Sequence, residues 1–152
     1  MNVLALDPGM TVGYAKFEDG CLIGCGHLLT VGEVADYIHK WAGDSVVPHN
    51  TIVYEGFARG NSVVKEQIVT IEMCGAIQAM AHVTESKLVM QYPAVRAGYI
   101  PIAKCMVKDS WGTLQEYHHA IDAIAHGLVY LDKEGIDWKK SYWMHKAFPS
   151  VD

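Results

Sequence analysis

The order of strand-like and helix-like segments constrains the fold of this chain more than any single motif does. Three segments with strand character come first, at residues 3–7, 12–17 and 21–29. The Asp19-Gly20 pair is a hairpin signal, which predicts that the second and third segments are antiparallel neighbours. From residue 30 onward helical and strand patterns alternate, as in sheets whose parallel strands are joined by helices. We therefore expect an α/β fold with a mixed central sheet, three antiparallel strands followed by parallel strands, and helices on both faces.

The remaining elements are predicted from periodicity and capping signals. Thr30 and Glu33 have the spacing of a capping box, so a helix is expected after them. Ser62 is a candidate N-cap for a long helix. The further expected elements are a strand at 51–55, the long helix to about residue 82, a strand at 87–91, short helical pieces with turns over 93–112 and a last helix over 113–131. The tail at 133–152 interleaves aromatic and basic residues; we expect it to pack back on the same domain, and gripping DNA or a partner is the alternative.

Length and composition bound the class of protein. With 152 residues, of which 51% are hydrophobic, the chain is expected to form one domain with a substantial core. No apolar run approaches the roughly 20 residues of a membrane span, and the N-terminus does not read as a signal peptide, so a cytoplasmic location is expected. The four cysteines are expected to be buried, reduced thiols, with zinc binding by Cys21, Cys25 and His27 as the weaker alternative.

The charge distribution leaves nucleic-acid binding open. The net charge is -5 at pH 7, whereas general nucleic-acid binders are usually basic. Residues 56–108, however, hold six basic side chains against three acidic ones. The overall charge therefore does not decide whether the chain binds nucleic acid.

Three acidic residues occupy positions that hydrophobic patterning does not explain. Asp7 and Glu55 end expected strands, and strand ends in α/β sheets are where sites are built. Asp122 lies in the last helix, on a polar stripe opposite its apolar face. The stripe consists of Gln115, His119, Asp122 and His126. Each acid has an ordinary alternative, as a turn former, a solvated side chain or part of an exposed helix face. Taken together with the order of elements, the three acids indicate a functional site.

Three motifs make the chain resemble a known family. They are Leu4-Ala5-Leu6-Asp7-Pro8-Gly9 followed by Gly13-Tyr14-Ala15, then Val53-Tyr54-Glu55-Gly56-Phe57, and finally His119-Ala120-Ile121-Asp122-Ala123-Ile124-Ala125. In order and spacing, over about residues 2–131, they resemble RuvC-type Holliday junction resolvases, which have the RNase H-like fold. The resemblance implies a single RNase H-like nuclease domain over 1–152, with 133–152 as a tail of separate role. The compact chain suggests a phage-encoded member, acting in the cytoplasm of a bacterium or of a phage-infected host.

The resemblance implies a two-metal active site. Family members hold two divalent cations, Mg²⁺ or Mn²⁺, and the matching positions here are Asp7, Glu55, His119 and Asp122. Two such metals activate a water and stabilise the leaving 3′-oxygen of a phosphodiester. Asp7 would bridge both metals, with Glu55 and Asp122 each completing one side. His119 would be either a ligand or a proton carrier, and as a ligand its imidazole would favour Mn²⁺ over Mg²⁺.

The resemblance also implies branched DNA as substrate and a homodimer whose two sites cut symmetric strands of a four-way junction. Forks and flaps are further expected substrates. The long helix after Ser62 resembles the family's dimer helix, although its apolar residues could equally be ordinary core. The candidate DNA-binding residues are Phe57, Arg59, Lys65, Lys104 and Lys108. Phe57 could stack on an unpaired base or pack beneath its loop, and Lys104 or, by preference, Lys108 could approach the scissile phosphate.

Two other functions stay open at this point. An RNA-directed nuclease of the YqgF type shares the fold, but the closing-helix motif and the long segment after Glu55 disfavour it. A junction-binding protein without catalysis would have no need of four metal ligands. The leading expectation is therefore a metal-dependent, structure-selective endonuclease that resolves Holliday junctions.

Overall fold

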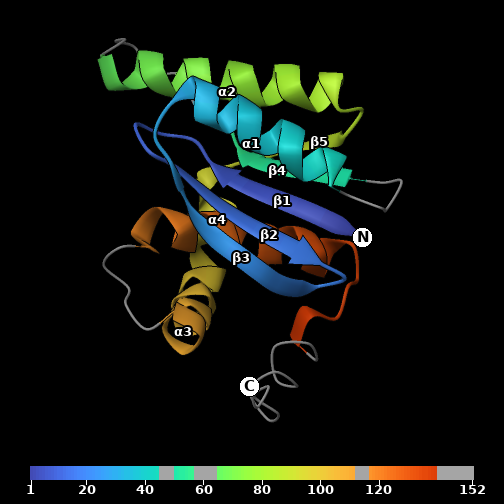
Figure 1. The fold of residues 1–152 in the computed structure, drawn as a ribbon. Helices are drawn as coiled ribbons and strands as arrows, with labels where there is room; N and C mark the ends of the chain where they lie inside the picture. The colour runs from blue at the N-terminus through green and yellow to red at the C-terminus, as the bar shows by residue number, and fades with distance from the viewer. Residues whose placement is uncertain (45–49, 57–64, 112–116, 140–152) are drawn as a thin grey trace.

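A five-stranded mixed sheet flanked by helices organises the chain in the computed structural model, which describes residues 1–44, 50–56, 65–111 and 117–139 (Figure 1). The strands are β1 (Asn2–Asp7), β2 (Val12–Glu18), β3 (Cys21–Leu28), β4 (Asn50–Glu55) and β5 (Lys87–Gln91), in the spatial order β3-β2-β1-β4-β5. The helices are α1 (Val31–Gly43), α2 (Lys65–Val83), the 3-10 helix η1 (Pro93–Tyr99), α3 (Ile100–Trp111) and α4 (His118–Lys133). None of the helices in these ranges is long and apolar enough to cross a bilayer.

The sheet is antiparallel on one side of β1 and parallel on the other. Strand β1 pairs antiparallel with β2, which pairs antiparallel with β3. Strand β4 pairs in parallel with both β1 and β5. The β2–β3 connection is a two-residue turn in which Asp19 and Gly20 have φ values of 47° and 84°, as a type I′ hairpin requires. The expected α/β class with a mixed sheet is confirmed.

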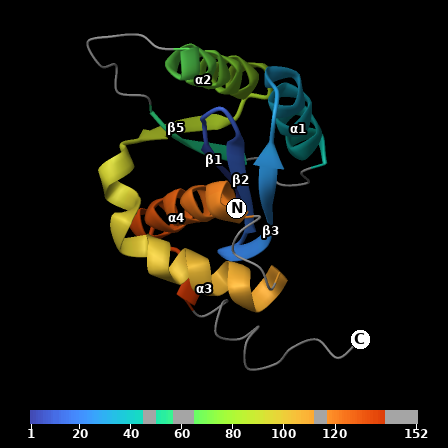
Figure 2. The same cartoon turned by 90° about the vertical axis from the view of Figure 1, so that its left-hand side faces the viewer.

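Alternate residues of the strands supply two separate cores. On β1, Leu4 and Leu6 pack with α1 and α2, whereas Val3 and Ala5 pack with α3 and α4. Figure 2 shows α4 lying against one face of the sheet, with α3 outside it, and α1 and α2 on the other face. The same alternation assigns Asp7, which follows Ala5 by two residues, to the face that α4 covers.

Two glycines let α4 approach the sheet closely. A Cβ atom at Gly13 of β2 would lie 1.9 Å from the carbonyl oxygen of His119, at the start of α4. A Cβ atom at Gly127 of α4 would lie 2.2 Å from the Phe17 ring of β2. Any larger residue at these positions would push α4 away from the strands. Because the helix lies so close, almost all of its length after His119 is buried.

The second half of the chain differs from the expected pattern in two places. The last helix begins at His118 rather than near residue 113, and 112–116 lie outside the described residues. After β5, the expected short helical pieces are one 3-10 helix followed by a continuous helix, α3. Pro101 falls in the first turn of α3, where its missing N–H costs nothing, and no glycine or proline follows it within the helix. The expected N-cap Ser62 also lies outside the described residues.

The four cysteines are free thiols with different degrees of exposure. Cys74 is buried, Cys21 and Cys25 are partly buried, and Cys105 is exposed. The expectation of four buried thiols is therefore wrong for Cys105, which lies on the solvent side of α3. Among the described residues, Cys21 and Cys25 belong to no group of metal-ligating side chains.

The described part of the tail packs back on the domain, as expected. Trp138 is 2% exposed, and its Nε1 donates a hydrogen bond of 2.7 Å to Oδ1 of Asp132 in α4. Its ring also lies beside that of Tyr99, with 6.5 Å between centroids. Residues 140–152 lie outside the described part of the chain.

Candidate metal centre

The carboxyl ends of three parallel strands carry the polar residues of the candidate site. Asp7 ends β1, Glu55 ends β4 and Gln91 ends β5. The pairing of Leu6 with Tyr54, and of Glu55 with Gln91, brings these three ends side by side. Because neighbouring strands are hydrogen-bonded along their length, the acids stand on a rigid frame at the edge where α/β sheets build their sites.

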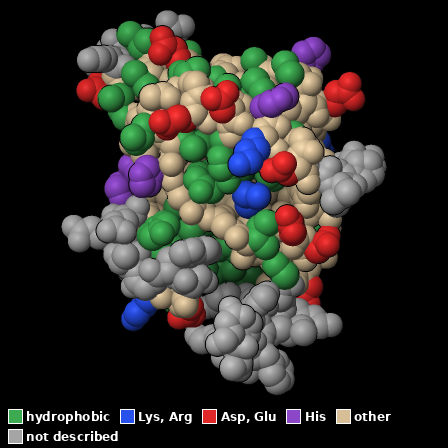
Figure 3. Space-filling model, viewed as in Figure 1, with side chains coloured by type: hydrophobic (Ala, Val, Ile, Leu, Met, Phe, Trp, Pro, Cys, Tyr) green, Lys and Arg blue, Asp and Glu red, His purple; other side chains and the backbone are tan. Residues whose placement is uncertain are grey.

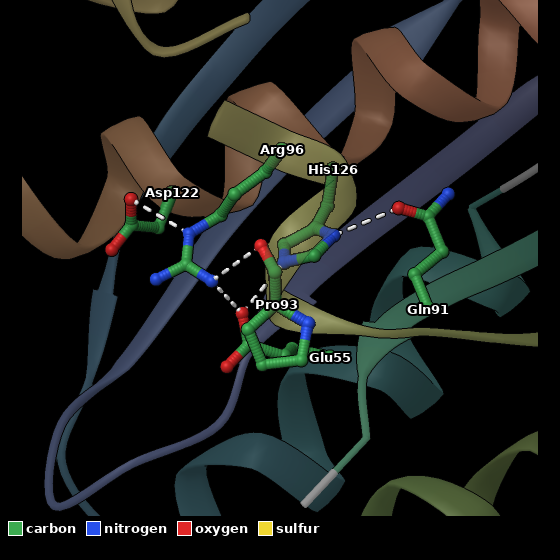
Figure 4. Close-up of polar contacts among 6 residues, drawn as sticks. All are labelled: Glu55, Gln91, Pro93, Arg96, Asp122 and His126. Atoms are coloured by element: carbon green, nitrogen blue, oxygen red, sulfur yellow. Dashed lines mark hydrogen bonds and ion pairs between the residues drawn. The ribbon is translucent and has the colours of Figure 1, made fainter. Parts of the chain in front are cut away.

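Helix α4 contributes a buried histidine to this edge. His126 is 0% exposed, and both of its ring nitrogens meet side-chain oxygens (Figure 4). Nε2 lies 2.8 Å from Oε2 of Glu55, and Nδ1 lies 2.8 Å from Oε1 of Gln91. Asp122 lies one turn earlier on the same helix, so its carboxylate faces the same edge. The histidine therefore joins β4, β5 and α4 within one site.

Arg96 of η1 inserts its guanidinium between two of the acids. Its Nη1 donates to Oε2 of Glu55, and its Nε lies 3.2 Å from Oδ1 of Asp122 (Figure 4). A further Nη1 hydrogen bond of 3.2 Å to the carbonyl oxygen of Pro93 holds the side chain in place. Arg96 thus acts as an internal counter-ion that bridges the β4 end of the site to α4.

The partly buried site contains three carboxyl groups and one guanidinium group, so acidic groups outnumber basic ones among these four residues. Burial is the largest cause that raises the pKa of Asp7 from 3.8 to about 7, and the nearby carboxylates of Glu55 and Asp122 raise it further. The guanidinium of Arg96 acts in the opposite direction but does not cancel these effects. One arginine therefore leaves the three carboxylates short of positive charge.

The donor set fits a divalent cation. Asp7, Glu55 and His126 each offer a ligand atom, and these atoms lie within 4.8 Å of one another. Carboxylate oxygens suit Mg²⁺ and Mn²⁺, and imidazole nitrogen suits transition metals. A cation among these side chains would relieve the repulsion that raises the pKa of Asp7. The residues present are therefore suitable for holding a metal ion.

Of the four ligand positions expected from the sequence, Asp7, Glu55 and Asp122 lie close enough to interact electrostatically, and His119 lies one turn before Asp122, at the start of α4. The rings of His119 and His118 lie next to each other, tilted by 42°, with 3.9 Å between centroids. Burial lowers the pKa of His119, His118 and His27 lower it further, and Asp122 opposes them. Among the described residues, His119 is not in the ligand group of Asp7, Glu55 and His126. Its role as ligand or proton carrier stays a prediction.

An open hollow of about 520 Å³ adjoins the acidic edge. It is lined by residues of η1, α3 and α4, among them Arg96, Lys104, His118 and Asp122. Lys104, which is expected to contact DNA, and Asp122, an acid of the site, therefore line the same hollow. Lys108 is exposed near the end of α3 and does not line this hollow.

The side chains of the other three DNA-binding candidates fall outside the part of the chain that the structure describes. Phe57 and Arg59 lie outside the described residues, as does the side chain of Lys65, the first residue of α2. All three stay predictions.

Sequence patterns alone do not assign a role to three residues of the site. His126 falls on the polar stripe of the last helix, and its spacing of four from Asp122 is the signal that could have found it. In the sequence Arg96 is only one of several basic side chains, and Gln91 is only a strand end. Gln91 could have been found as the last residue of a strand that ends beside the acids, and Arg96 as a basic residue shortly after that strand.

Among the solved structures similar to this one are two of RuvC and one of a Holliday junction resolvase. RuvC of Thermus thermophilus in complex with a Holliday junction substrate matches with a TM-score of 0.63 and 18% identity, covering 90% of this chain and 97% of that chain. A second Thermus thermophilus RuvC structure matches with a TM-score of 0.59 and 17% identity, covering 90% of this chain and 98% of that chain. The yeast mitochondrial Holliday junction resolvase Ydc2 matches with a TM-score of 0.57 and 13% identity, covering 96% of this chain and 83% of that chain.

Comparisons of sequence give no further identification. The chain matches no protein-family model, and no curated protein matches it significantly. The likeness is therefore one of structure, and it spans nearly the whole of this chain and of the two RuvC chains. This confirms the fold expected from the sequence: the chain has the RNase H-like α/β fold of RuvC-type Holliday junction resolvases.

Proposed function

We propose that this protein is a metal-dependent, structure-selective DNA endonuclease that resolves four-way junctions. The observation that carries the proposal is the cluster at the carboxyl ends of β1 and β4, where Asp7 and Glu55 meet Asp122 and His126 of α4. The fold is shared with structures solved as Holliday junction resolvases, one of them with junction DNA. Neither feature alone would name the substrate, but together they favour branched DNA.

The roles that we propose for the acids are based on their positions. Asp7, whose carboxyl group interacts with those of Glu55 and Asp122, would hold divalent cations together with these two acids. Bound Mg²⁺ or Mn²⁺ supplies water activation and charge stabilisation at the leaving 3′-oxygen. The side chains of this chain would hold the ions in a partly buried space, where bulk water screens their charge less.

The hollow beside the acids suits the phosphate backbone. Lys104 and Arg96 line it together with Asp122, so a phosphodiester entering the hollow would meet positive charge next to the carboxylates. Ion pairing to phosphate would hold the scissile bond against the cluster and make binding sensitive to salt. Lys104 is therefore the described lysine with the best position to orient the substrate.

A homodimer would use the outer surface of α2. Ile68 and Ile71 on this helix are 47% and 44% exposed, and Met90 of the neighbouring β5 is 51% exposed. Between α2 and β5 an open hollow is lined by Tyr54, Gly56, Ile71, Cys74, Gly75, Gln78 and Met90. Figure 3 shows hydrophobic side chains among acidic ones along the upper part of the molecule, where Figure 1 places α2. Exposed apolar side chains of this kind favour an interface between copies.

A comparison of labelled substrates tests the proposal. A four-way junction, a fork, a flap, linear duplex and an RNA–DNA hybrid are incubated with the protein and Mn²⁺. We expect paired nicks near the crossover of the junction for the wild type, and loss of cleavage with retained binding for Asp7→Asn. The matched control Asp36→Asn removes an exposed acid of α1 and should cut as the wild type does. Cleavage of RNA or hybrid alone, or tight junction binding without cleavage, would overturn the proposal.

A further inference from the structure

The buried histidine of α4 has contacts that a core residue does not need. Both nitrogens of His126 meet side-chain oxygens at 2.8 Å, one from Glu55 and one from Gln91. A histidine needed only for packing would bury its polar atoms at a cost that an apolar residue avoids. The ligand set implied by the family resemblance uses His119 and Asp122 on this helix and gives His126 no role.

The neighbours of the imidazole indicate where its proton lies. With the amide of Gln91 oriented as in the structure, its oxygen faces Nδ1 of His126 and can only accept a hydrogen bond, so Nδ1 carries the ring proton. In a neutral ring Nε2 then holds a lone pair, and it faces a carboxylate oxygen of Glu55, which is also an acceptor. Two acceptors lie this close only when a metal ion lies beside both or a proton lies between them, and the experiment described below distinguishes these two arrangements.

This arrangement is the usual one for a histidine that binds a metal. A ligating imidazole donates its other ring N–H to a fixed acceptor, which sets the tautomer and the orientation of the ring. Gln91 fills this role from the end of β5, with a side chain only 4% exposed. The Gln91 backbone carbonyl also accepts a hydrogen bond of 2.8 Å from the N–H of Gly56, so the residue is held at both ends.

The distances agree with shared coordination. In an octahedral site with bonds of about 2.1 Å, adjacent ligand atoms lie about 3 Å apart. Nε2 of His126 and Oε2 of Glu55 are 2.8 Å apart, which is the spacing of two neighbouring ligands around a single ion. One ligand atom each of Asp7, Glu55 and His126 lie within 4.8 Å of one another, so Asp7 reaches the same ion after a small movement of its side chain.

We propose that Nε2 of His126 is a protein ligand, with Asp7 and Glu55, of a divalent cation in this site, and that Gln91 is the positioning residue of that ligand. The inference rests on the metal-dependent function proposed above and names one of its ligands. A nitrogen ligand shifts the preference of the site from Mg²⁺ toward Mn²⁺. Arg96 gives up its contact with Glu55 when the ion binds.

The experiment measures Mn²⁺ on the full chain without DNA. Electron paramagnetic resonance of free Mn²⁺ gives the dissociation constant, and electron spin-echo modulation detects a directly coordinated ¹⁴N nucleus. We expect ¹⁴N coupling in the wild type, its loss in His126→Gln, and Mn²⁺ binding weakened about tenfold or more in that variant. His119→Gln, which alters the other candidate histidine of α4, is the matched control and should keep the coupling.

Three results would overturn the inference: no coordinated nitrogen in the wild type, coupling that survives His126→Gln, or coupling lost in His119→Gln. If the amide nitrogen of Gln91 faces His126 instead, Nε2 of His126 carries the proton, donates it to Glu55 and only orients that carboxylate. The wild type would then show no coordinated nitrogen. Should His126→Gln fail to fold, Gln91→Leu retains the imidazole and should weaken Mn²⁺ binding about 10- to 100-fold. Unchanged affinity in Gln91→Leu would then contradict the positioning role, and the wild-type spectrum still decides the ligand.

The outcome is separable from that of the proposed function. A protein that shows the nitrogen coupling but cuts no junction keeps the metal ligand and loses the proposed substrate. A protein that cuts junctions with Mn²⁺ but shows no nitrogen coupling keeps the function and loses the ligand assignment.

Discussion

Replacing Asp7 by asparagine should stabilise the metal-free protein at alkaline pH. Burial, followed by repulsion from Glu55 and Asp122, raises the pKa of Asp7 from 3.8 to about 7 in the folded state. Between these two values the folded state binds more protons than the unfolded state, so the free energy of unfolding falls as the pH rises through this window. Above pH 7 the charged Asp7 therefore destabilises the fold, and below about pH 4 it does not. Asparagine resembles the protonated acid and removes this penalty.

The size of the effect can be worked out from the shift. About three pKa units at 1.36 kcal/mol each give an upper value of about 4 kcal/mol, and partial exposure of the site reduces it to about 2–3 kcal/mol. We expect Asp7→Asn to be more stable than the wild type by this amount at pH 8 in EDTA, and equally stable near pH 4. Urea denaturation of both proteins at the two pH values, with Asp36→Asn as a control for the loss of one exposed charge, measures the difference.

Metal should reverse the order at pH 8. Saturating Mn²⁺ stabilises whichever folded protein binds it, so the wild type gains stability and Asp7→Asn gains little. A stabilisation by Asp7→Asn that is the same at pH 4 and pH 8 would refute the electrostatic reasoning. A destabilisation at pH 8 in EDTA would refute it as well.

Three further substitutions probe the site and the way it is built. Arg96→Gln removes the internal counter-ion of Glu55 and Asp122 and should therefore tighten Mn²⁺ binding about tenfold or more. Titration of the protein with Mn²⁺ in the absence of DNA measures this affinity. Unchanged affinity would show that Arg96 does not compete with the ion. Lys104→Ala should weaken junction binding and reduce the magnitude of the slope of log K against log salt by about 1. Lys108→Ala, outside the hollow, should change cleavage less than Lys104→Ala does. A larger effect of Lys108→Ala would instead support the prediction from the sequence, which favoured Lys108. Gly13→Ala would place a Cβ 1.9 Å from the carbonyl oxygen of His119 and should cost about 3 kcal/mol in urea unfolding, and a neutral effect would contradict the close packing of α4.

The acids at the strand ends were predictable because the signals that place them are local. An apolar strand that stops at Asp7-Pro8-Gly9 gives both the element and its end, and the strand before Glu55 does the same. The two-residue alternation along each strand then assigns both side chains to one face. Neither strand end requires long-range information to locate, and the strands of the structure agree with the expected ones.

The rest of the site depends on tertiary packing that periodicity does not report. His126 falls on the polar stripe of α4, and a polar stripe indicates an exposed face. The side chain is nevertheless fully buried, because Glu55 and Gln91 satisfy its polar atoms from two different strands. Arg96 reaches the acids because η1 follows directly after the end of β5. Such contacts join residues 35 to 71 positions apart along the chain, so no local pattern predicts them.

The most direct test of the central claim is metal-triggered cleavage of a junction that is already bound. The protein is first assembled with a four-way junction in EDTA, its four strands labelled separately, and excess Mn²⁺ is then added while nicks are counted on each strand. The account predicts no cleavage before Mn²⁺, then paired nicks on two opposing strands, and loss of these nicks in Glu55→Gln with junction binding retained. Nicks that form in EDTA, or that persist in Glu55→Gln, would contradict a nuclease centre built on the carboxyl ends of β1 and β4.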